Sequence, residues 1–408
     1  GGYVADGELS EDRREPVIAA AVGWALLSAV VICGGCVAFS EQLAVATTER
    51  SQDTLVLALL LASQGLRIVT YPAEGVLKLR FQSLPIVFMS FGEFLVTGLG
   101  SVLALTVFDA GLEGMAWASL AGAMLRLGLG FVYLPEMRSP RLDLPVAKGL
   151  VRYGLPLMPG AVATIVLSLV DRRFFIAYGL EAEGGLYAYG DKWARMVEFL
   201  LITPLVGMWP AVFFNIAKDD DAREQFARIA SLFAAVGGAL AFAITAMGPV
   251  LTALFDTSET GEFSGSHGPI GVLTVGYVLF GLNEVARVGF QLSGRTRRTA
   301  LSMVIAALLN LALNALLIPR YGALGAAWAT LLAYGCTVLA SLALTRAVYP
   351  QRWELGSLTH VLVVYCGAAW ALGQFVPETT PVGIVVRVLA CAGVPLLLLG
   401  TGFLRPVE

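Results

Sequence analysis

A short run of charges, Asp171-Arg172-Arg173, lies between two apolar stretches in the segment SLVDRRFFIAYG. Its immediate neighbours are Val170 and Phe174. Carboxylate and guanidinium groups in such a setting can neutralise one another, or they can bind an ion of opposite charge. Which of the two applies depends on the elements that carry the charges.

Thirteen ionisable residues of this kind lie inside apolar stretches of the chain. Eight are basic: Arg67, Arg126, Arg172, Arg173, Lys192, Arg195, Arg287 and Arg387. Five are acidic: Glu93, Asp171, Asp191, Glu198 and Glu284. Charged groups removed from water are costly unless they are paired or solvated, so thirteen of them indicate structural pairs, a binding site, or both.

The composition places these residues in a membrane. The chain has 408 residues, 57% of them hydrophobic and only 14% charged, whereas soluble proteins average about 25% charged residues. The apolar stretches are about twenty residues long, enough to cross a hydrocarbon core of about 30 Å. We therefore predict an all-α polytopic membrane protein. The twelve expected spans are 17–39, 54–73, 84–107, 112–134, 153–178, 185–210, 226–250, 269–291, 299–318, 323–345, 357–376 and 382–404.

The loop charges predict the orientation of these spans. The N-terminus and every second connection carry seventeen basic residues: Arg13, Arg14, Lys78, Arg80, Arg138, Arg141, Lys148, Arg152, Lys218, Arg223, Arg228, Arg295, Arg297, Arg298, Arg346, Arg352 and Arg405. The alternate connections carry only Arg50 and Arg320. Cytoplasmic loops hold the lysine and arginine excess of membrane proteins, so we expect both ends of this chain on the cytoplasmic side.

Two similar stretches predict an internal repeat. GLEGMAWASL begins at Gly111 and GALGAAWATL at Gly322, and six of ten positions match at an offset of 211 residues. Both stretches enter the membrane from the same side, which is typical of parallel repeats. We expect two helix bundles around a central cavity, residues 1–148 and 149–348, followed by two additional C-terminal helices in 349–408. Because the offset spans six helices and only four precede residue 149, we expect about two helices to be missing before residue 1.

The motifs RYGLPLMPG, DRRFF, GLYAYGDK and NLALNALLIPRYGALGAAWAT resemble the oligosaccharide flippases of bacterial polysaccharide synthesis. These flippases are similar in turn to lipid II flippases and to multidrug-and-toxin-extrusion transporters, within one exporter superfamily. The resemblance runs from residue 1 to 404 and is best in 150–345. It implies two six-helix bundles that face a central cavity. It also implies that the protein moves an undecaprenyl-diphosphate-linked glycan from the inner to the outer leaflet of a bacterial cell membrane.

Helix geometry predicts which membrane charges meet. At 1.5 Å per residue, Asp171 and Lys192 lie equally far from the turn near residue 181, so we expect them to face each other. Arg67, Glu93 and Arg126 share one depth on three consecutive helices. The pairs Asp191/Arg195, Arg195/Glu198 and Glu284/Arg287 have the spacing of neighbours on one helix face. Mutual neutralisation, which holds helices in register, is the structural alternative for all of these charges.

The functional alternative depends on the excess of eight cations over five acids. A diphosphate is an anion, and a low-dielectric cavity that admits it needs a positive lining. We therefore expect substrate contacts from Arg172, Lys192, Arg195, Arg287, Arg67 and Arg126, with Arg287, Arg195 and Arg172 met in that order. Asp171, Asp191, Glu198, Glu93 and Glu284 are expected to be charge partners or ion-coupling groups. Pro156 and Pro159 predict a kink in the helix that carries Asp171.

Other kinds of site lack the required residues. The chain has no G-x-x-x-x-G-K-[ST] phosphate loop, and Asp219-Asp220-Asp221 is more simply explained as part of a solvated loop. The two histidines and the Cys33/Cys36 pair do not form a metal set. We expect no cofactor, no metal and no enzymatic activity. The expected partners are a lipid-linked anionic glycan, membrane lipids and, as a further option, polysaccharide polymerase machinery; we expect a monomer and no nucleic acid. The alternatives are a small-molecule or cation antiporter of the same fold and, third, a membrane glycosyltransferase or polymerase.

Overall fold

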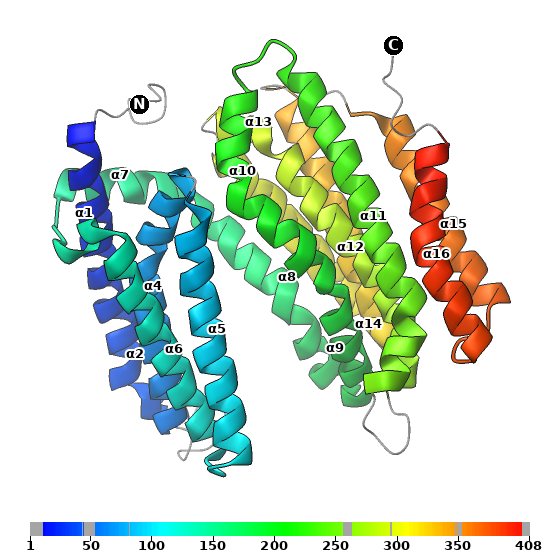
Figure 1. Ribbon diagram of the computed structural model, residues 1–408, viewed down its shortest axis with the longest axis horizontal. Helices are drawn as coiled ribbons and strands as arrows, with labels where there is room; N and C mark the ends of the chain where they lie inside the picture. Colours follow the sequence, from blue (N-terminus) through cyan, green and yellow to red (C-terminus); the bar gives the residue numbers. More distant parts are fainter. Residues whose placement is uncertain are drawn as a thin grey trace. The chain divides into compact units, whose positions relative to one another are not determined.

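The computed structural model describes residues 11–42, 44, 54–80, 82–255, 263–293, 296–346, 349 and 353–401. These residues form helices and connecting turns, and ten of the segments are long and apolar enough to cross a membrane. The prediction of an all-α polytopic membrane protein is confirmed. The chain divides into two compact units, Gly1–Tyr153 and Gly154–Glu408, whose helices run from blue to teal and from green to red in Figure 1.

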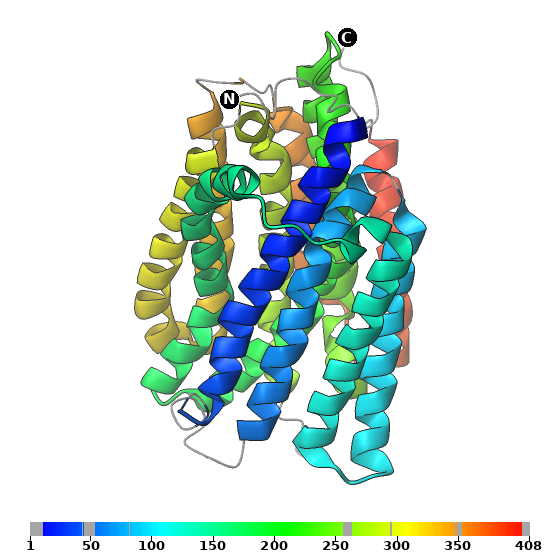
Figure 2. The same ribbon diagram turned by 90° about the vertical axis from the view of Figure 1, so that its left-hand side faces the viewer.

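The first unit holds four membrane-length segments (Figure 2). They are α1 (Glu11–Ser28), which continues through a π-helical stretch at Ala29–Gly34 into α2 (Gly35–Ala38), then α4 (Thr54–Leu79), α5 (Ser83–Thr106) and α6 (Gly111–Tyr133). Helix α6 packs against both α4 and α5, and α1 packs against α4. The three helices that carry Arg67, Glu93 and Arg126 are therefore mutual neighbours.

A short helix and a break precede the segment that carries the DRRFF charges. Helix α7 (Leu144–Gly154) ends before a single 3-10 turn, η4 (Leu155–Leu157), and α8 (Met158–Ala177) then begins. Pro156 lies in the turn, and Pro159 lies in the first turn of α8, where a proline needs no hydrogen-bond donor. The expected span 153–178 thus starts later, and the prolines mark a break before the helix and not a kink inside it.

The second unit contains α8 and the remaining helices. These are α9 (Glu181–Ala194), a π-helical stretch η5 (Glu198–Ile202), α10 (Thr203–Ile216), α11 (Ala222–Phe255), α12 (His267–Ala286), α13 (Val288–Leu292), α14 (Thr296–Thr345), α15 (Leu355–Phe375) and α16 (Pro381–Gly400). Two helices are joined within α14 at Gly322, whose φ of 53° and ψ of −132° are not helical. Only glycine adopts such a conformation at little cost.

Helix α12 lies at the centre of the second unit, where it contacts α9, α11 and α14. Ile270 and Leu273 of α12 are fully buried, and Phe226 and Phe242 of α11 belong to the same core. Large apolar side chains such as Phe375 remain exposed on the outer helices. Exposed apolar surface of this extent is typical of a protein that is solvated by lipid.

The two matched sequence stretches begin in the same way. Gly111, at the start of α6, has a φ of 54°, and Gly322, before the second half of α14, has a φ of 53°. Each stretch therefore follows a tight turn that glycine makes possible. Whether the two units are related by a repeat axis stays a prediction, as do the expected helices before residue 1.

Candidate functional site

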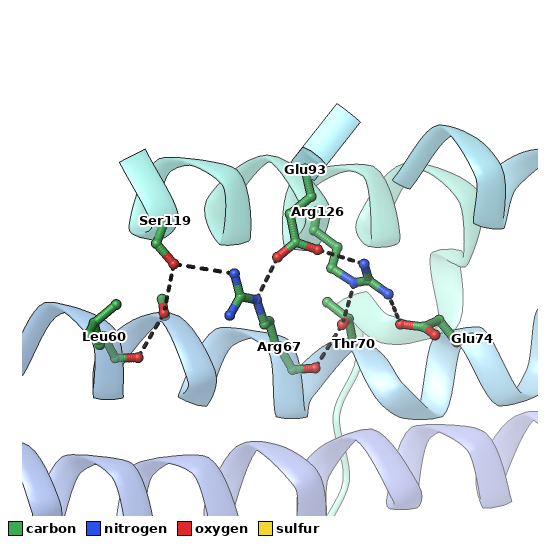
Figure 3. Close-up of polar contacts among 8 residues, drawn as sticks. Leu60, Arg67, Thr70, Glu74, Glu93, Ser119 and Arg126 are labelled. Atoms are coloured by element: carbon green, nitrogen blue, oxygen red, sulfur yellow. Dashed lines mark hydrogen bonds and ion pairs between the residues drawn. The ribbon is translucent and has the colours of Figure 1, made fainter. Parts of the chain in front are cut away.

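A network of charges joins three helices of the first unit (Figure 3). The Glu93 carboxylate of α5 accepts from Arg67 of α4 at 2.5 Å and from Arg126 of α6 at 2.6 Å. Arg67 also donates to the Ser119 hydroxyl of α6 at 3.3 Å, and Arg126 donates to Thr70 of α4 at the same distance. The predicted meeting of Arg67, Glu93 and Arg126 at one depth is confirmed.

Glu74 completes this network, and sequence reasoning missed it. Arg126 forms a second ion pair with the Glu74 carboxylate, and the side chains of both residues are largely buried. Because α4 extends to Leu79, Glu74 lies inside the helix, whereas the expected span ended at residue 73. The signal was present, since Arg67, Thr70 and Glu74 recur at the i, i+3 and i+7 spacing of one helix face.

The network in the first unit is electrically balanced. Two guanidinium groups, Arg67 and Arg126, face two carboxylates, Glu74 and Glu93. Charge-assisted hydrogen bonds between such groups are strong, and they satisfy donors that would otherwise be costly inside a membrane. The arrangement favours a structural role, which was the alternative for these residues, and it offers little net charge to an anionic ligand.

A second polar cluster surrounds Asp171 in the second unit. The Asp171 side chain is 3% exposed and accepts hydrogen bonds from the Tyr187 hydroxyl of α9, at 2.6 Å, and from the Asn314 amide of α14. Tyr187 also lies 3.3 Å from the Thr330 hydroxyl, and Asn314 donates to Asn310 at 3.0 Å. Every direct hydrogen-bond partner of this carboxylate is therefore neutral.

The expected pair between Asp171 and Lys192 is wrong. Lys192 is exposed, and none of the ion pairs between described residues includes it. Equal distance from a turn fixed the depth of both residues but not their rotation about the helix axes. Asp171 instead accepts hydrogen bonds from Tyr187, on the same helix as Lys192, and from Asn314 of the distant helix α14.

Asp191 of α9 belongs to a third polar group, together with Arg195, Glu198 and Tyr277. Its carboxylate accepts from Arg195 at 2.7 Å and from the Tyr277 hydroxyl of α12 at 2.7 Å. Arg195 also pairs with Glu198 at 3.3 Å, and its guanidinium lies 5.6 Å from the centre of the Tyr277 ring. Both predicted pairs of Arg195 are confirmed. Their helix is interrupted at Glu198 by a π-helical stretch, a feature frequent at functional sites.

Arg287 and Arg387 also have partners within the protein, although the Nε atom of each is buried without one. Arg287 forms an ion pair with Glu284, as the spacing predicted. Arg387 of α16 donates to the backbone carbonyls of Ala246, at 2.8 Å, and Val376, at 3.1 Å. Arg387 therefore fastens the C-terminal helix pair to α11.

Three of the predicted membrane cations have no side-chain partner among the described residues. Arg172, Arg173 and Lys192 are exposed, and no side-chain hydrogen bond or ion pair to another described residue involves them. All three lie on α8 and α9, next to the buried carboxylates Asp171 and Asp191. Helices α8 and α9 therefore carry the predicted membrane cations whose side chains have no partner among the described residues. Whether Arg172 and Lys192 contact substrate stays a prediction.

The other candidate features form no site in the described part of the chain. Asp219 and Asp221 accept hydrogen bonds from Gln225 at the start of α11, which suits an exposed loop and helix start. No group of three or more His, Cys, Asp or Glu side chains that could hold a metal occurs among the described residues. Cys33 and Cys36 are both free thiols.

Solved transporter structures share this fold. A structure described as "Lipid II flippase MurJ, inward closed conformation" matches with a TM-score of 0.63 and 12% identity, over 98% of this chain and 86% of that one. A MOP superfamily transporter from Pyrococcus furiosus matches with a TM-score of 0.65 and 16% identity, over 82% and 78% of the two chains. A MATE structure in complex with MaL6 matches with a TM-score of 0.65 and 17% identity, over the same shares.

The comparison with curated proteins found no match. A family model described as "Polysaccharide biosynthesis protein" matches residues 11–259. This range covers more than half of the chain, including the charge network of the first unit and, from the cluster around Asp171, Asp171 and Tyr187. It agrees with the resemblance that the glycine, proline and DRRFF motifs indicated. The chain is a multi-pass membrane protein with the fold of the MOP superfamily, and it belongs to the polysaccharide biosynthesis protein family.

Proposed function

We propose that this protein is a flippase that moves an undecaprenyl-diphosphate-linked oligosaccharide from the inner to the outer leaflet of a bacterial inner membrane. The observation that carries the proposal is the set of three unpaired cations, Arg172, Arg173 and Lys192, on α8 and α9. Membership in a polysaccharide biosynthesis family supports a glycan substrate. The name of the similar lipid II flippase supports a lipid-linked one.

Electrostatics connects the unpaired cations to an anionic headgroup. A charge on a membrane helix costs on the order of 3 kcal/mol on insertion scales, and most span charges of this chain recover that energy through partners. Arg172, Arg173 and Lys192 have no such partner in the described part of the chain, so we expect their charge to be available to a ligand. A diphosphate carries at least two negative charges and binds guanidinium groups in a bidentate manner. The diphosphate headgroup would then contact Arg287 first, Arg195 next and Arg172 last.

Asp171 is the group best placed to couple transport to an ion. It is buried and has only neutral hydrogen-bond partners, Tyr187 and Asn314. An ionised carboxylate in such a position is unfavourable unless it takes up a proton or a monovalent cation. Nearby uncharged oxygens of Asn310, Asn314 and Thr330 would suit either ion. Binding and release at this position could drive the transport cycle without ATP.

A small-molecule exporter of the same fold is the second candidate, because the TM-score of the MATE structure in complex with MaL6, 0.65, is as high as that of the lipid II flippase, 0.63. The charges on α8 and α9 argue against cationic drugs as substrates, since unpaired arginine and lysine side chains repel them. We therefore place the glycolipid first. The sequence has no G-x-x-x-x-G-K-[ST] phosphate loop, and no group of His, Cys, Asp or Glu side chains that could hold a metal occurs among the described residues, so we also propose a transporter and not a glycosyltransferase.

Reconstituted proteoliposomes test the proposal. The wild-type protein should transfer a labelled undecaprenyl-diphosphate glycan between leaflets without forming glycosidic bonds, and it should not extrude a cationic dye. Arg172→Gln, Arg173→Gln and Lys192→Gln should each lower the initial rate about tenfold, the effect of losing roughly 1.4 kcal/mol of binding at a charged contact. Arg346→Gln, which removes an exposed cation from a loop, is the matched control and should transport normally.

The same assay separates coupling from substrate binding. Asp171→Asn keeps the shape of the side chain but cannot change its charge. We expect it to abolish the stimulation of transport by an imposed proton or sodium gradient while glycolipid binding persists. Normal rates in all three cation variants, or dye extrusion in place of glycolipid transfer, would contradict the flippase proposal.

A further inference from the structure

Helix α7 is amphipathic, with apolar residues on one face and two cations on the other. At 100° per residue, Leu144, Val146, Ala147, Leu150 and Val151 fall on one side of the helix axis. Lys148, Gly149 and Arg152 fall on the other, with the two cations one turn apart. Among the apolar residues, Leu144 is 63% exposed and Val151 59% exposed. None of the α7 residues whose side chains are described belongs to a buried apolar cluster of either unit.

Hydrogen bonds attach the segment before α7 to α1, at a defined position along the axis of α1. The Arg141 amide donates to the Ala19 carbonyl at 3.0 Å, and the Trp24 indole donates to the Asp143 carbonyl at 3.0 Å. Gly23 lies directly beneath this segment, and a Cβ atom there would overlap the Arg141 carbonyl. Asp143 also caps the first turn of α7 through a 3.1 Å hydrogen bond from the Val146 amide. The start of α7 is therefore held beside α1.

The position of these contacts along α1 corresponds to a membrane interface. The apolar span of α1 begins at Pro16, after the charged residues 11–15. Ala19 and Trp24 lie three and eight residues further along, or about 5 Å and 12 Å inside the boundary at 1.5 Å per residue. Interfacial amphipathic helices bury their apolar face about 5–10 Å into the boundary between headgroups and acyl chains. Trp24 is of the residue type that is enriched at this level.

The charges around α7 are those that an acidic lipid surface attracts. Exposed basic side chains gather at this end of the first unit: Lys78, Arg80, Arg138, Arg141, Lys148 and Arg152. Arg80 pairs with Glu136, but Lys148 and Arg152 have no ion-pair partner among the described residues. At the opposite end of α5 and α6 the described charges are acidic, Asp109 and Glu113.

We propose that α7 is an interfacial helix that binds acidic phospholipid headgroups. Its apolar face, Leu144, Leu150 and Val151, enters the acyl-chain boundary, while Lys148 and Arg152 contact headgroup phosphates at the surface. The partner is the anionic leaflet itself, because only a lipid surface offers acyl chains to one face of the helix and negative charge to the other. The proposal is independent of which substrate the protein moves.

Spin-labelled lipids test whether Lys148 and Arg152 bind acidic headgroups. The measurement uses the full chain in bilayers of phosphatidylcholine with added phosphatidylglycerol. The wild type should retain labelled phosphatidylglycerol in preference to labelled phosphatidylcholine. Lys148→Gln and Arg152→Gln should each reduce this preference about fivefold, and high salt should do the same. Both side chains are exposed and unpaired, so these variants should fold normally. Lys218→Gln, which removes an exposed cation outside α7, should leave the preference unchanged.

Fluorescence quenching by lipids tests whether the apolar face of α7 enters the acyl-chain region. A fluorophore on Leu150→Cys should be quenched by lipids brominated on the acyl chain, and one on Gly149→Cys should not, because Gly149 lies on the polar face with open space around it. The five native cysteines would be replaced first. Unchanged lipid preference in both charge variants, or equal quenching at positions 149 and 150, would overturn the proposal. Since neither readout is export, such a result would leave the flippase proposal intact.

Discussion

Single residues decide which membrane charges stabilise the protein and which remain available. Glu93 is the clearest structural case, because one carboxylate serves two arginines from two other helices. Arg172, Arg173 and Lys192 are the opposite case, since they make no such contact with described residues. The contrast arises from geometry, because partners at one depth can pair only when both side chains turn toward each other.

The charge network of the first unit should fail when its central carboxylate is neutralised. Glu93→Gln leaves Arg67 and Arg126 facing an amide, so a partly buried positive charge loses its counter-ion. We expect a loss of about 1–3 kcal/mol in stability, below the range for fully buried pairs. A lowered thermal midpoint of the purified protein would show it. Glu113→Gln at an exposed helix start is the control, and equal midpoints for the two variants would exclude the structural role.

A pH-dependent contact lies at the end of α4, outside the membrane spans. Partial burial of Glu136 by itself would raise the pKa of its carboxyl, but the hydrogen bond and charge of Arg80 outweigh this, and the pKa is lowered. A lowered folded-state pKa stabilises the protein above the unfolded-state pKa, and the stabilisation is lost as the pH falls through the folded-state value.

Glu136→Gln should therefore be less stable than the wild type near neutral pH, by up to about 1 kcal/mol for such an exposed pair. The difference should shrink as the pH falls through and below the ordinary carboxyl pKa of about 4.3. Thermal midpoints of both proteins between pH 7 and pH 3.5 would measure it. A difference that stays constant with pH would show that the ion pair contributes nothing.

At the scale of elements, the turn within α14 positions its two halves, and both contribute residues to the polar cluster around Asp171. Asn310 and Asn314 lie before Gly322, and Thr330 lies after it. The Ala323 amide just beyond the turn donates to the Glu183 carboxylate of α9 at 2.9 Å. The turn thus connects α9 to α14 near the residues that surround Asp171.

Gly322→Ala should disturb this turn. Alanine disfavours the φ of 53° and ψ of −132°, and its Cβ would overlap the Glu183 carboxylate. We expect a loss of about 1–3 kcal/mol in stability. Gly335→Ala, in the second half of α14, is the matched control, because its Cβ would make an ordinary contact with Leu279 at 3.6 Å. Thermal unfolding of both variants would compare them, and an unaffected Gly322 variant would refute the argument.

Two interruptions of regular α-helix in the second unit occur at charged residues, Glu198 and Arg287. The helix that carries Asp191 and Arg195 gives way to a π-helical stretch at Glu198, and α12 ends where Arg287 begins a new turn before α13. Both breaks lie beside ion pairs within the second unit. Such irregular stretches are tolerated in membranes where neighbouring helices satisfy the freed backbone groups.

At the scale of the whole molecule, the sorting of loop charges predicts the orientation of the chain. Six exposed basic residues lie at one end of the first unit and acidic residues at the other. In the second unit, Lys218 lies in the turn before α11 and Arg223 at the start of α11, beside Asp219, Asp220 and Asp221, whereas Glu181 and Glu183 lie in the first turn of α9. Arg50, Arg295, Arg352 and Arg405, which contribute to the predicted sorting, lie outside the described residues, as do the side chains of Arg13 and Arg14.

Cysteine labelling in intact cells would test this orientation. In a protein without its native cysteines, a membrane-impermeant maleimide should label Glu181→Cys but not Asp220→Cys, because lysine and arginine are retained on the cytoplasmic side. Permeabilised cells provide the control, since both positions are exposed and should then react. Labelling of Asp220→Cys alone in intact cells would mean that the orientation is reversed.

The sequence by itself determined the class of the protein, its approximate spans and several of its ion pairs. Composition and run length suffice for membrane helices, because the bilayer sets their length. The pairs of Arg195 and Arg287 follow from spacing along one helix. The meeting of Arg67, Glu93 and Arg126 follows from equal distances to shared turns, since the rise per residue is constant.

Only the tertiary structure decided how each helix is rotated and which distant helix it meets. Asp171 has the depth of Lys192 but turns toward Tyr187 and Asn314, and no local spacing relates α8 to α14. Glu74 joined the first network because α4 continues past Pro72, which neighbouring helices permit in a membrane. Spacing fixes height along an axis, whereas the rotation that selects a partner is set by the packing of the whole bundle.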